Sequence, residues 1–213
     1  MNPEYSSLRK KIDLSPNQIL ALGFLSIIII GTFLLHLEWA SAGEKPIEWI
    51  DALFTATSAT CVTGLIVLDT GSDFSLFGQW VILILFQIGG LGIMTFSTMF
   101  AFLLGKKISL RQRLIIQQSL NQFSIGGLVR LAKYIILFTL AFEGIGTIFL
   151  YLNWKQVNSN HSSLFLSFFH AISAFCNAGF SLFSDSLQAY TTNTGINIIF
   201  LTLIIFGGIG FLV

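Results

Sequence analysis

Charged residues are scarce in this chain: they make up 10% of its 213 positions, whereas 54% of the positions are hydrophobic. An average globular domain has about 25% charged residues, so this composition excludes a water-soluble domain and indicates an integral membrane protein. The chain also has only three prolines and no linker rich in serine and proline. Nothing therefore indicates a soluble domain attached in series.

Enzyme motifs are also lacking. The sequence contains no G-x-S-x-G, no H-E-x-x-H and no P-loop, and its glycine-rich tetrads lie inside hydrophobic runs. The two cysteines, Cys61 and Cys176, are too few for a disulfide framework, and we expect them to be buried as small apolar groups. His170 stands alone, which favours a structural hydrogen bond over a metal site. We expect no enzyme activity, no cofactor and no nucleic-acid partner.

Four apolar runs are long enough to cross about 30 Å of hydrocarbon as helices. The first run could instead be a cleaved secretory signal, because basic residues precede it and residues 40–42 resemble a cleavage site. Its length and its later repetition favour a membrane span. The four predicted spans cover residues 19–37, 79–104, 131–152 and 196–213.

Basic residues flank these spans mainly on one side, and only Lys45 and Lys155 lie on the other. The positive-inside rule places the basic side in the cytoplasm, which predicts a multi-pass cell-membrane protein with a cytoplasmic N-terminus. The opposite side is acidic, which favours cations at a pore mouth. The basic residues of the cytoplasmic side are Arg9, Lys10, Lys11, Lys106, Lys107, Arg111, Arg113, Arg130 and Lys133.

Residues 51–65 are too apolar for a surface loop and too short to cross a bilayer. We interpret them as part of a re-entrant pore loop, with a short helix over about 47–59 and an extended return over 62–65. Irregular backbone survives at membrane depth only where it is buried in protein or lines a cavity.

The same segment occurs twice. A shift of 115 residues lays 166–180 over 51–65 and pairs Cys61 with Cys176 and Gly64 with Gly179; a shift of 118 pairs the tetrads at 89–92 and 207–210. The chain is therefore predicted to be an all-α membrane protein of tandem helix–pore loop–helix units with potassium-channel-like architecture, two of an expected four. We divide it into a cytoplasmic segment 1–18, a first unit 19–104, an interfacial linker 105–130 and a second unit 131–213.

The return segments are the candidate ion-selectivity filter. Backbone carbonyls can replace the hydration shell of an alkali cation, and a glycine permits the backbone angles that turn a carbonyl inward. Either glycine alone could mark an ordinary turn, but both occupy one repeat position. The predicted filter residues, which would bind potassium through backbone carbonyls, are Val62, Thr63, Gly64, Leu65, Asn177, Ala178, Gly179 and Phe180.

Several motifs together resemble the Trk/Ktr/HKT potassium transporters, most closely the KtrB type of membrane subunit. They are residues 51–65, Asp69-Thr-Gly, Phe77-Gly-Gln and the run 87–95. The resemblance implies potassium uptake by one chain of four units around a pore, with sodium as a candidate coupling ion, and Gly64 suggests potassium permeation. It also implies a homodimer in the lipid bilayer on a cytosolic, KtrA-like nucleotide-binding ring.

The chain departs from that family in length, because it holds two units and Val213 interrupts a helix. We therefore expect an incomplete piece of a longer protein. Two alternatives remain: a tandem-pore cation channel completed by dimerisation, and a non-conducting truncated fragment that binds partner subunits. The linker could anchor to anionic lipid or contact the cytosolic ring.

Two features have no role in this scheme. Glu143 lies in the middle of the third span, where an ionisable group is by default a functional candidate, and we expect it to hydrogen-bond a neighbouring helix. Its repeat counterpart is Ile28, so it cannot belong to a symmetric ring. The glycine tetrads could be hinges, but close helix packing is the more common use of small residues in membranes.

Overall fold

The computed structural model describes residues 16–43, 45–92, 128–155 and 162–209. Over these residues the chain is helical, and apart from one isolated bridge between Ser41 and Phe74 they form no β-structure. The all-α expectation is therefore confirmed for this part of the chain. The N-terminal segment up to residue 15 and residues 93–127, which include most of the predicted linker, lie outside the described residues.

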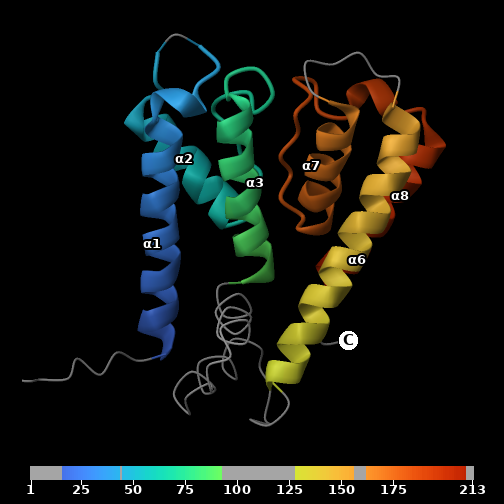
Figure 1. Ribbon diagram of the computed structural model, residues 1–213, viewed down its shortest axis with the longest axis horizontal. Coiled ribbons are helices and arrows are strands. Elements are labelled where there is room, and N and C mark those ends of the chain that lie inside the picture. Colours follow the sequence, from blue (N-terminus) through green and yellow to red (C-terminus); the bar gives the residue numbers. More distant parts are fainter. Residues whose placement is uncertain (1–15, 44, 93–127, 156–161, 210–213) are drawn as a thin grey trace, which may run out of the picture.

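The first group of helices contains α1 (Pro16–His36), the short 3-10 helix η1 (Glu38–Ala40), α2 (Trp49–Thr60) and α3 (Leu76–Leu91). α1 and α3 stand beside each other, and the shorter α2 packs against both of them (Figure 1).

The second group repeats this order with α6 (Leu128–Trp154), α7 (Ser163–Phe175), the 3-10 helix η2 (Gln188–Tyr190) and α8 (Thr194–Ile209). α7 packs between α6 and α8 as α2 packs between α1 and α3. After α7 the chain turns back along that helix on the side that faces α3 (Figure 1).

Serine and glycine fix two of the helix ends. The hydroxyl of Ser75 accepts a hydrogen bond from the amide of Gly78 and caps the start of α3. The helix ends at Leu91 because Gly92 adopts a φ of 73°, in the left-handed region that favours glycine. The prediction of one unbroken helix over 79–104 is therefore wrong, because the helix ends within the glycine tetrad. Residues 93–104 of that predicted span lie outside the described residues.

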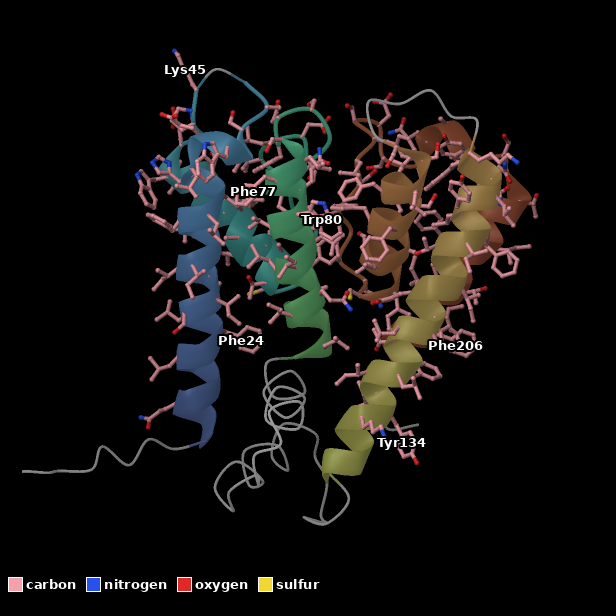
Figure 2. All side chains as sticks on the ribbon, viewed as in Figure 1. Phe24, Lys45, Phe77, Trp80, Tyr134 and Phe206 are labelled. Carbon is pink, nitrogen blue, oxygen red and sulfur yellow. The ribbon has the colours of Figure 1, made fainter. Side chains whose placement is uncertain are left out.

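Within the described residues, Lys133–Trp154 is the one helix that is long and apolar enough to cross a membrane by itself. Four others are apolar but shorter: Ala21–His36, Leu76–Leu91, Ser163–Phe175 and Thr194–Gly208. Large apolar side chains also cover outer faces of the helices (Figure 2). Leu137 on α6 and Ile29 on α1 are about 60% exposed, a surface suited to lipid or to further protein rather than to water.

Close packing within each group depends on a glycine of the first helix. A Cβ on Gly31 of α1 would lie 2.8 Å from the side chain of Leu85 on α3, and a Cβ on Gly146 of α6 would lie 2.8 Å from Leu203 on α8. These four residues are related by the repeat. α1 and α3 are therefore held as close together as α6 and α8.

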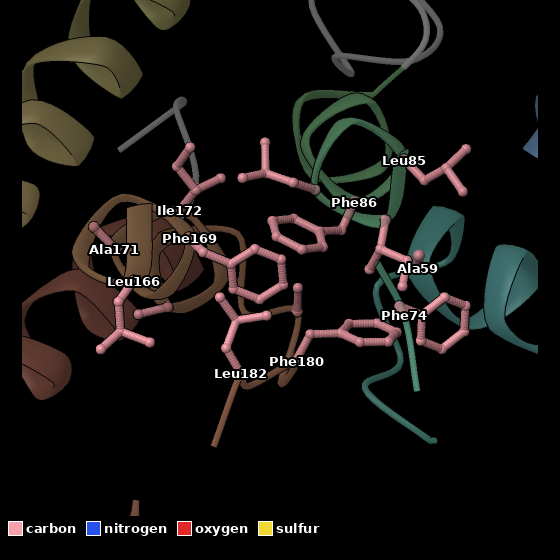
Figure 3. Packing of buried hydrophobic residues seen from close by; sticks show 14 of the residues in the cluster. Ala59, Phe74, Leu85, Phe86, Leu166, Phe169, Ala171, Ile172, Phe180 and Leu182 are labelled. Atoms are coloured by element: carbon pink, nitrogen blue, oxygen red, sulfur yellow. The ribbon is translucent and has the colours of Figure 1, made fainter. Parts of the chain in front are cut away.

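The two groups meet where α3 faces α7. Phe86 of α3 is fully buried, and its ring packs edge-on against Phe169 of α7 at 5.4 Å and parallel to Phe180 at 6.0 Å (Figure 3). Trp80, six residues earlier on α3, contacts Phe165. Aromatic pairs of this kind contribute about 0.5–1.5 kcal/mol each beyond the area they bury.

Candidate functional site

The segments after α2 and α7 adopt the same backbone conformation. Val62 and Asn177 have φ values of 57° and 56°, and Gly64 and Gly179 both have a φ of 73°. A positive φ is uncommon for a β-branched residue such as valine. The repeat therefore extends to the individual backbone angles of both return segments.

The same hydrogen bonds hold both return segments to their short helices. The amide of Thr63 donates to the carbonyl of Ser58 at 2.9 Å, and the amide of Ala178 donates to the carbonyl of Ser173 at 2.8 Å. Each turn is closed by its own short helix and so does not depend on its neighbour for its local shape.

Serine hydroxyls engage the last predicted filter residue in each segment. Ser58 Oγ donates to the carbonyl oxygen of Leu65 at 2.7 Å, and Ser173 Oγ donates to that of Phe180 at 2.6 Å. These two carbonyls thus point back at their own short helices. In the described part of the chain, no group donates to the carbonyl oxygens of residues 62–64 and 177–179.

The two return segments touch at their glycines. A Cβ on Gly64 would lie 2.7 Å from the carbonyl oxygen of Ala178 and 3.1 Å from Cα of Gly179, and a Cβ on Gly179 would lie 3.1 Å from Cα of Gly64. The structure thus brings together Gly64, Ala178 and Gly179, from segments 115 positions apart. Only glycine at both positions permits this approach.

The side chains of the other predicted filter residues point in different directions. Thr63 Oγ1 donates to Ser58 Oγ at 2.9 Å, and Asn177 Nδ2 donates to the carbonyl of Ile204 at 3.4 Å. Leu65 is 63% exposed. No three acidic, histidine or cysteine side chains gather to hold a metal within the described ranges. The two return segments therefore contact each other through main-chain atoms.

His170 is a structural residue, as the sequence predicted. Its Nδ1 lies 2.8 Å from the carbonyl of Leu166, and its Nε2 lies 3.0 Å from Ser181 Oγ and accepts a weak hydrogen bond from the amide of Leu182 at 3.4 Å. The ring is 1% exposed. It holds the chain that leaves the second return segment against α7.

Sequence analysis quoted Gln79 within the Phe77-Gly-Gln motif but gave it no structural role. Gln79 is fully buried, and its Nε2 donates to the carbonyl of Phe74 at 2.9 Å and approaches that of Gly71 at 3.4 Å. It fixes the loop that leads from the first return segment into α3. A buried glutamine in an apolar run was the available signal, because such a group needs local partners.

The first glycine of each tetrad has a packing role. A Cβ on Gly89 would overlap the carbonyl oxygen of Thr60 at the end of α2, and a Cβ on Gly207 would overlap that of Phe175 at the end of α7. Gly89 and Gly207 thus let α3 and α8 press against the C-terminal ends of the short helices. Gly92 differs, since a Cβ there would meet nothing within 4 Å.

The cysteines are free thiols, but they do not share the burial we expected. Cys176 is half-buried, whereas Cys61 is exposed. The difference arises because Cys176 packs against Gly90 of α3, at the junction of the two groups. The first group has no described neighbour at the equivalent position, so the prediction of burial is wrong for Cys61.

A second contact joins the two groups near the starts of α3 and η2. A Cβ on Gly71 would overlap the carbonyl oxygen of Leu182, so the two chains touch there through their backbones. Beside this contact, partial burial raises the pKa of the Asp69 carboxyl, but hydrogen bonds from the Ser184 side chain and from the amides of Gly71 and Ser72 outweigh it. The net effect is a pKa below the usual value for an aspartate.

This lowered pKa predicts an acid-sensitive contact. A carboxyl whose pKa is depressed on folding adds stability above its unfolded pKa of about 3.9, and this contribution is lost as the pH falls through the folded value. The thermal midpoint of the detergent-solubilised full-length protein should therefore fall more steeply below pH 4 than that of Asp69→Asn. Above pH 5 the variant should be the less stable of the two. Parallel curves from pH 7 to 3 would contradict this prediction.

Comparisons with known proteins give the chain a family. Residues 14–213 match the family model TrkH, described as a cation transport protein. The chain is 50% identical over 204 residues to the Ktr system potassium uptake protein B of Bacillus subtilis, covering 96% of this chain and 45% of the relative. It is 41% identical over 200 residues to the potassium/sodium uptake protein NtpJ of Enterococcus hirae, covering 94% and 44%.

A further relative is the Ktr system potassium uptake protein B of Vibrio alginolyticus, 42% identical over 196 residues, which cover 92% of this chain and 43% of that protein. The chain thus spans less than half the length of these curated relatives. The family match covers nearly all of the chain, in agreement with the resemblance drawn from its motifs, and on this evidence the chain belongs to the TrkH family of cation transport proteins.

Proposed function

We propose that the chain supplies two of the four helix–pore loop–helix units of a potassium-uptake protein. Two findings support this: the chain is a member of a cation transport family, and its relatives are more than twice its length. A transporter family also means that the chain is a membrane protein and not an enzyme. The pore-loop interpretation, the four units and the ion are our proposals.

The observation that carries the proposal is the contact of two return segments with identical backbone angles and open carbonyls. Gly64 and Gly179 face each other, and the Ala178 carbonyl points across this contact. A potassium filter needs main-chain oxygens turned toward a shared axis in place of water. We assign the ion-facing oxygens to residues 62–64 and 177–179, and the serine-bound carbonyls of Leu65 and Phe180 to support of the loop.

The short helices would add to this preference for cations. α2 and α7 end directly before the return segments, at Thr60 and Phe175. The C-terminal end of a helix carries roughly half a negative charge from its unsatisfied carbonyls. Two such ends beside the loops would lower the energy of a cation there without any ionised side chain.

The names of the relatives are consistent with potassium as the transported ion, and one of them names sodium as well. We propose potassium for this protein, with sodium as the candidate coupling ion. We also propose a homodimer in the cell membrane, with its N-terminus in the cytoplasm and a cytosolic, KtrA-like nucleotide-binding ring as its partner. The name "Ktr system" is in keeping with a subunit that works with other components.

Growth of bacteria that lack their own potassium uptake tests this proposal. Expression of the full-length protein should restore growth at limiting potassium and should produce saturable uptake of rubidium as a tracer. An excess of potassium, but not of lithium, should compete with the tracer. If the protein reaches the membrane and carries no potassium, the proposed function is wrong.

A further inference from the structure

Three polar side chains form a partly buried series of hydrogen bonds where the two groups of helices meet. Gln87 of α3 donates from Nε2 to Glu143 Oε1 of α6 at 2.8 Å, and its Oε1 accepts from the thiol of Cys176 at 3.3 Å. Glu143 is only 3% exposed. The expected hydrogen bond of Glu143 to a neighbouring helix is thereby confirmed, and it continues to a third element.

This series of hydrogen bonds ends at Cys176, directly beside the second return segment. Cys176 caps the C-terminal end of α7, where its amide donates to the carbonyl of Ile172 at 2.8 Å, and the next residue is Asn177. A Cβ on Gly90 would lie 2.8 Å from Cys176 Sγ, so the thiol already sits close against the backbone of α3. Movement of the Gln87 side chain would therefore act on the residue from which the second loop departs.

Both partners depart from the repeat. The position equivalent to Glu143 in the first group is Ile28, and the position equivalent to Gln87 in the second group is Ile205. The junction therefore has a carboxyl and an amide where the repeat has apolar side chains elsewhere. Because ionisable and amide groups are expensive inside a membrane, a pair that replaces two isoleucines needs a reason other than packing.

Stability alone does not supply that reason. Apolar side chains of similar volume usually stabilise a buried interface as well as a polar pair does, whereas a polar pair fixes one register through its directional bonds. The amide of Gln87 is oriented at both ends, since its nitrogen faces the carboxyl group of Glu143 and its oxygen faces the thiol of Cys176. The orientation of Cys176 relative to α3 and α6 is thereby specified.

We propose that Glu143 and Gln87 are positioning residues that hold Cys176, and with it the carbonyls of residues 177–179, in the orientation that discriminates potassium from sodium. This inference rests on the proposed function, because it assigns a role in the selectivity of the same loops. The two residues act through Cys176 and touch no ion. The charge of Glu143 is not required; its acceptor oxygen is.

Substitutions that separate hydrogen bonding from packing test this assignment in the full-length protein. Glu143→Gln keeps an acceptor for Gln87 and should retain the potassium-to-sodium uptake ratio of the wild type. Glu143→Ile leaves the half-buried amide of Gln87 without its acceptor and should lower that ratio about tenfold. Combining it with Gln87→Ile installs the pair found elsewhere in the repeat, which should restore the amount of folded protein in the membrane but not the ratio.

Two cysteine variants complete the test. Cys176→Ala should lower the uptake ratio as the double isoleucine variant does. Cys61→Ala, at the repeat-related position, should leave it unchanged, because none of the described residues gives Cys61 a glutamine partner. Recovery of the ratio in the double variant, or loss of the ratio in Glu143→Gln, would overturn the positioning role. These outcomes require a wild type that transports potassium; a wild type that does not would instead refute the proposed function, and this inference with it.

Discussion

Replacing Gly64 with alanine is expected to reduce potassium uptake by the full-length protein by about one to two orders of magnitude. The φ of 73° at this position is strained for any residue with a Cβ, and the added carbon would lie 2.7 Å from the carbonyl oxygen of Ala178. The opposing segment must move away, and its carbonyl would leave the position that we assign to ion contact. Initial rates of rubidium uptake measure the effect.

A matched control and a companion variant sharpen this prediction. Gly144→Ala adds the same carbon to α6 at a position where a Cβ meets nothing within 4 Å, so transport should not change. Gly179→Ala should resemble Gly64→Ala, because its Cβ would lie 3.1 Å from Cα of Gly64. Normal uptake by Gly64→Ala at normal membrane abundance would show that the contact of the two glycines is not part of the ion path.

The second large effect concerns stability. Gly207→Ala would force a methyl group into the carbonyl oxygen of Phe175, and α8 would have to separate from the end of α7. Overpacking against backbone commonly costs about 1–3 kcal/mol and sometimes more, and we expect the upper end because a carbonyl cannot rotate away as a side chain can. The thermal midpoint of the detergent-solubilised protein should fall by several degrees.

Gly89→Ala should have a similar effect, because the equivalent overlap there is with the carbonyl of Thr60. Gly144→Ala again serves as the control, and its midpoint should stay the same or rise slightly, since alanine favours a helix by about 1 kcal/mol over glycine. If Gly207→Ala and Gly89→Ala both had the midpoint of the wild type, the close approach of α3 and α8 to the short helices would be refuted.

Much of the local structure could be predicted from the sequence because the chain contains two copies of one unit, and each copy could be compared with the other. The short helix expected over about 47–59 is found at Trp49–Thr60, and the paired glycines that marked the return segments have the same φ. Hydrophobic length was less informative. The run through residues 79–104 gave no sign of where its helix would stop, because the glycines in it were compatible both with packing and with a helix end.

Contacts across the junction could not be predicted for a physical reason. Gln87 and Glu143 are 56 positions apart, and no local periodicity relates them. The different exposure of Cys61 and Cys176 likewise depends on which helix lies beside each of them. A repeat predicts what two units have in common, whereas the surface between them is made by the residues in which the units differ.

Trp39 has a consequence for how the first group sits in lipid. It lies on η1 and is 76% exposed, while its repeat equivalent, Trp154, is fully buried among His170 and other aromatic rings. Its carbonyl accepts the hydroxyl of Ser75, which ties it to the start of α3. Indole rings prefer the headgroup layer, where the polar N–H edge of the ring contacts water and its apolar face contacts lipid.

Trp39 would thus anchor the first group of helices at a fixed depth in the bilayer. We expect it to keep the η1 turn and the start of α3 close to the headgroup layer, while α2 runs from there toward the middle of the molecule (Figure 1). A bilayer that thins or thickens would displace this ring first, and the strain would reach the loops through α2 and α3.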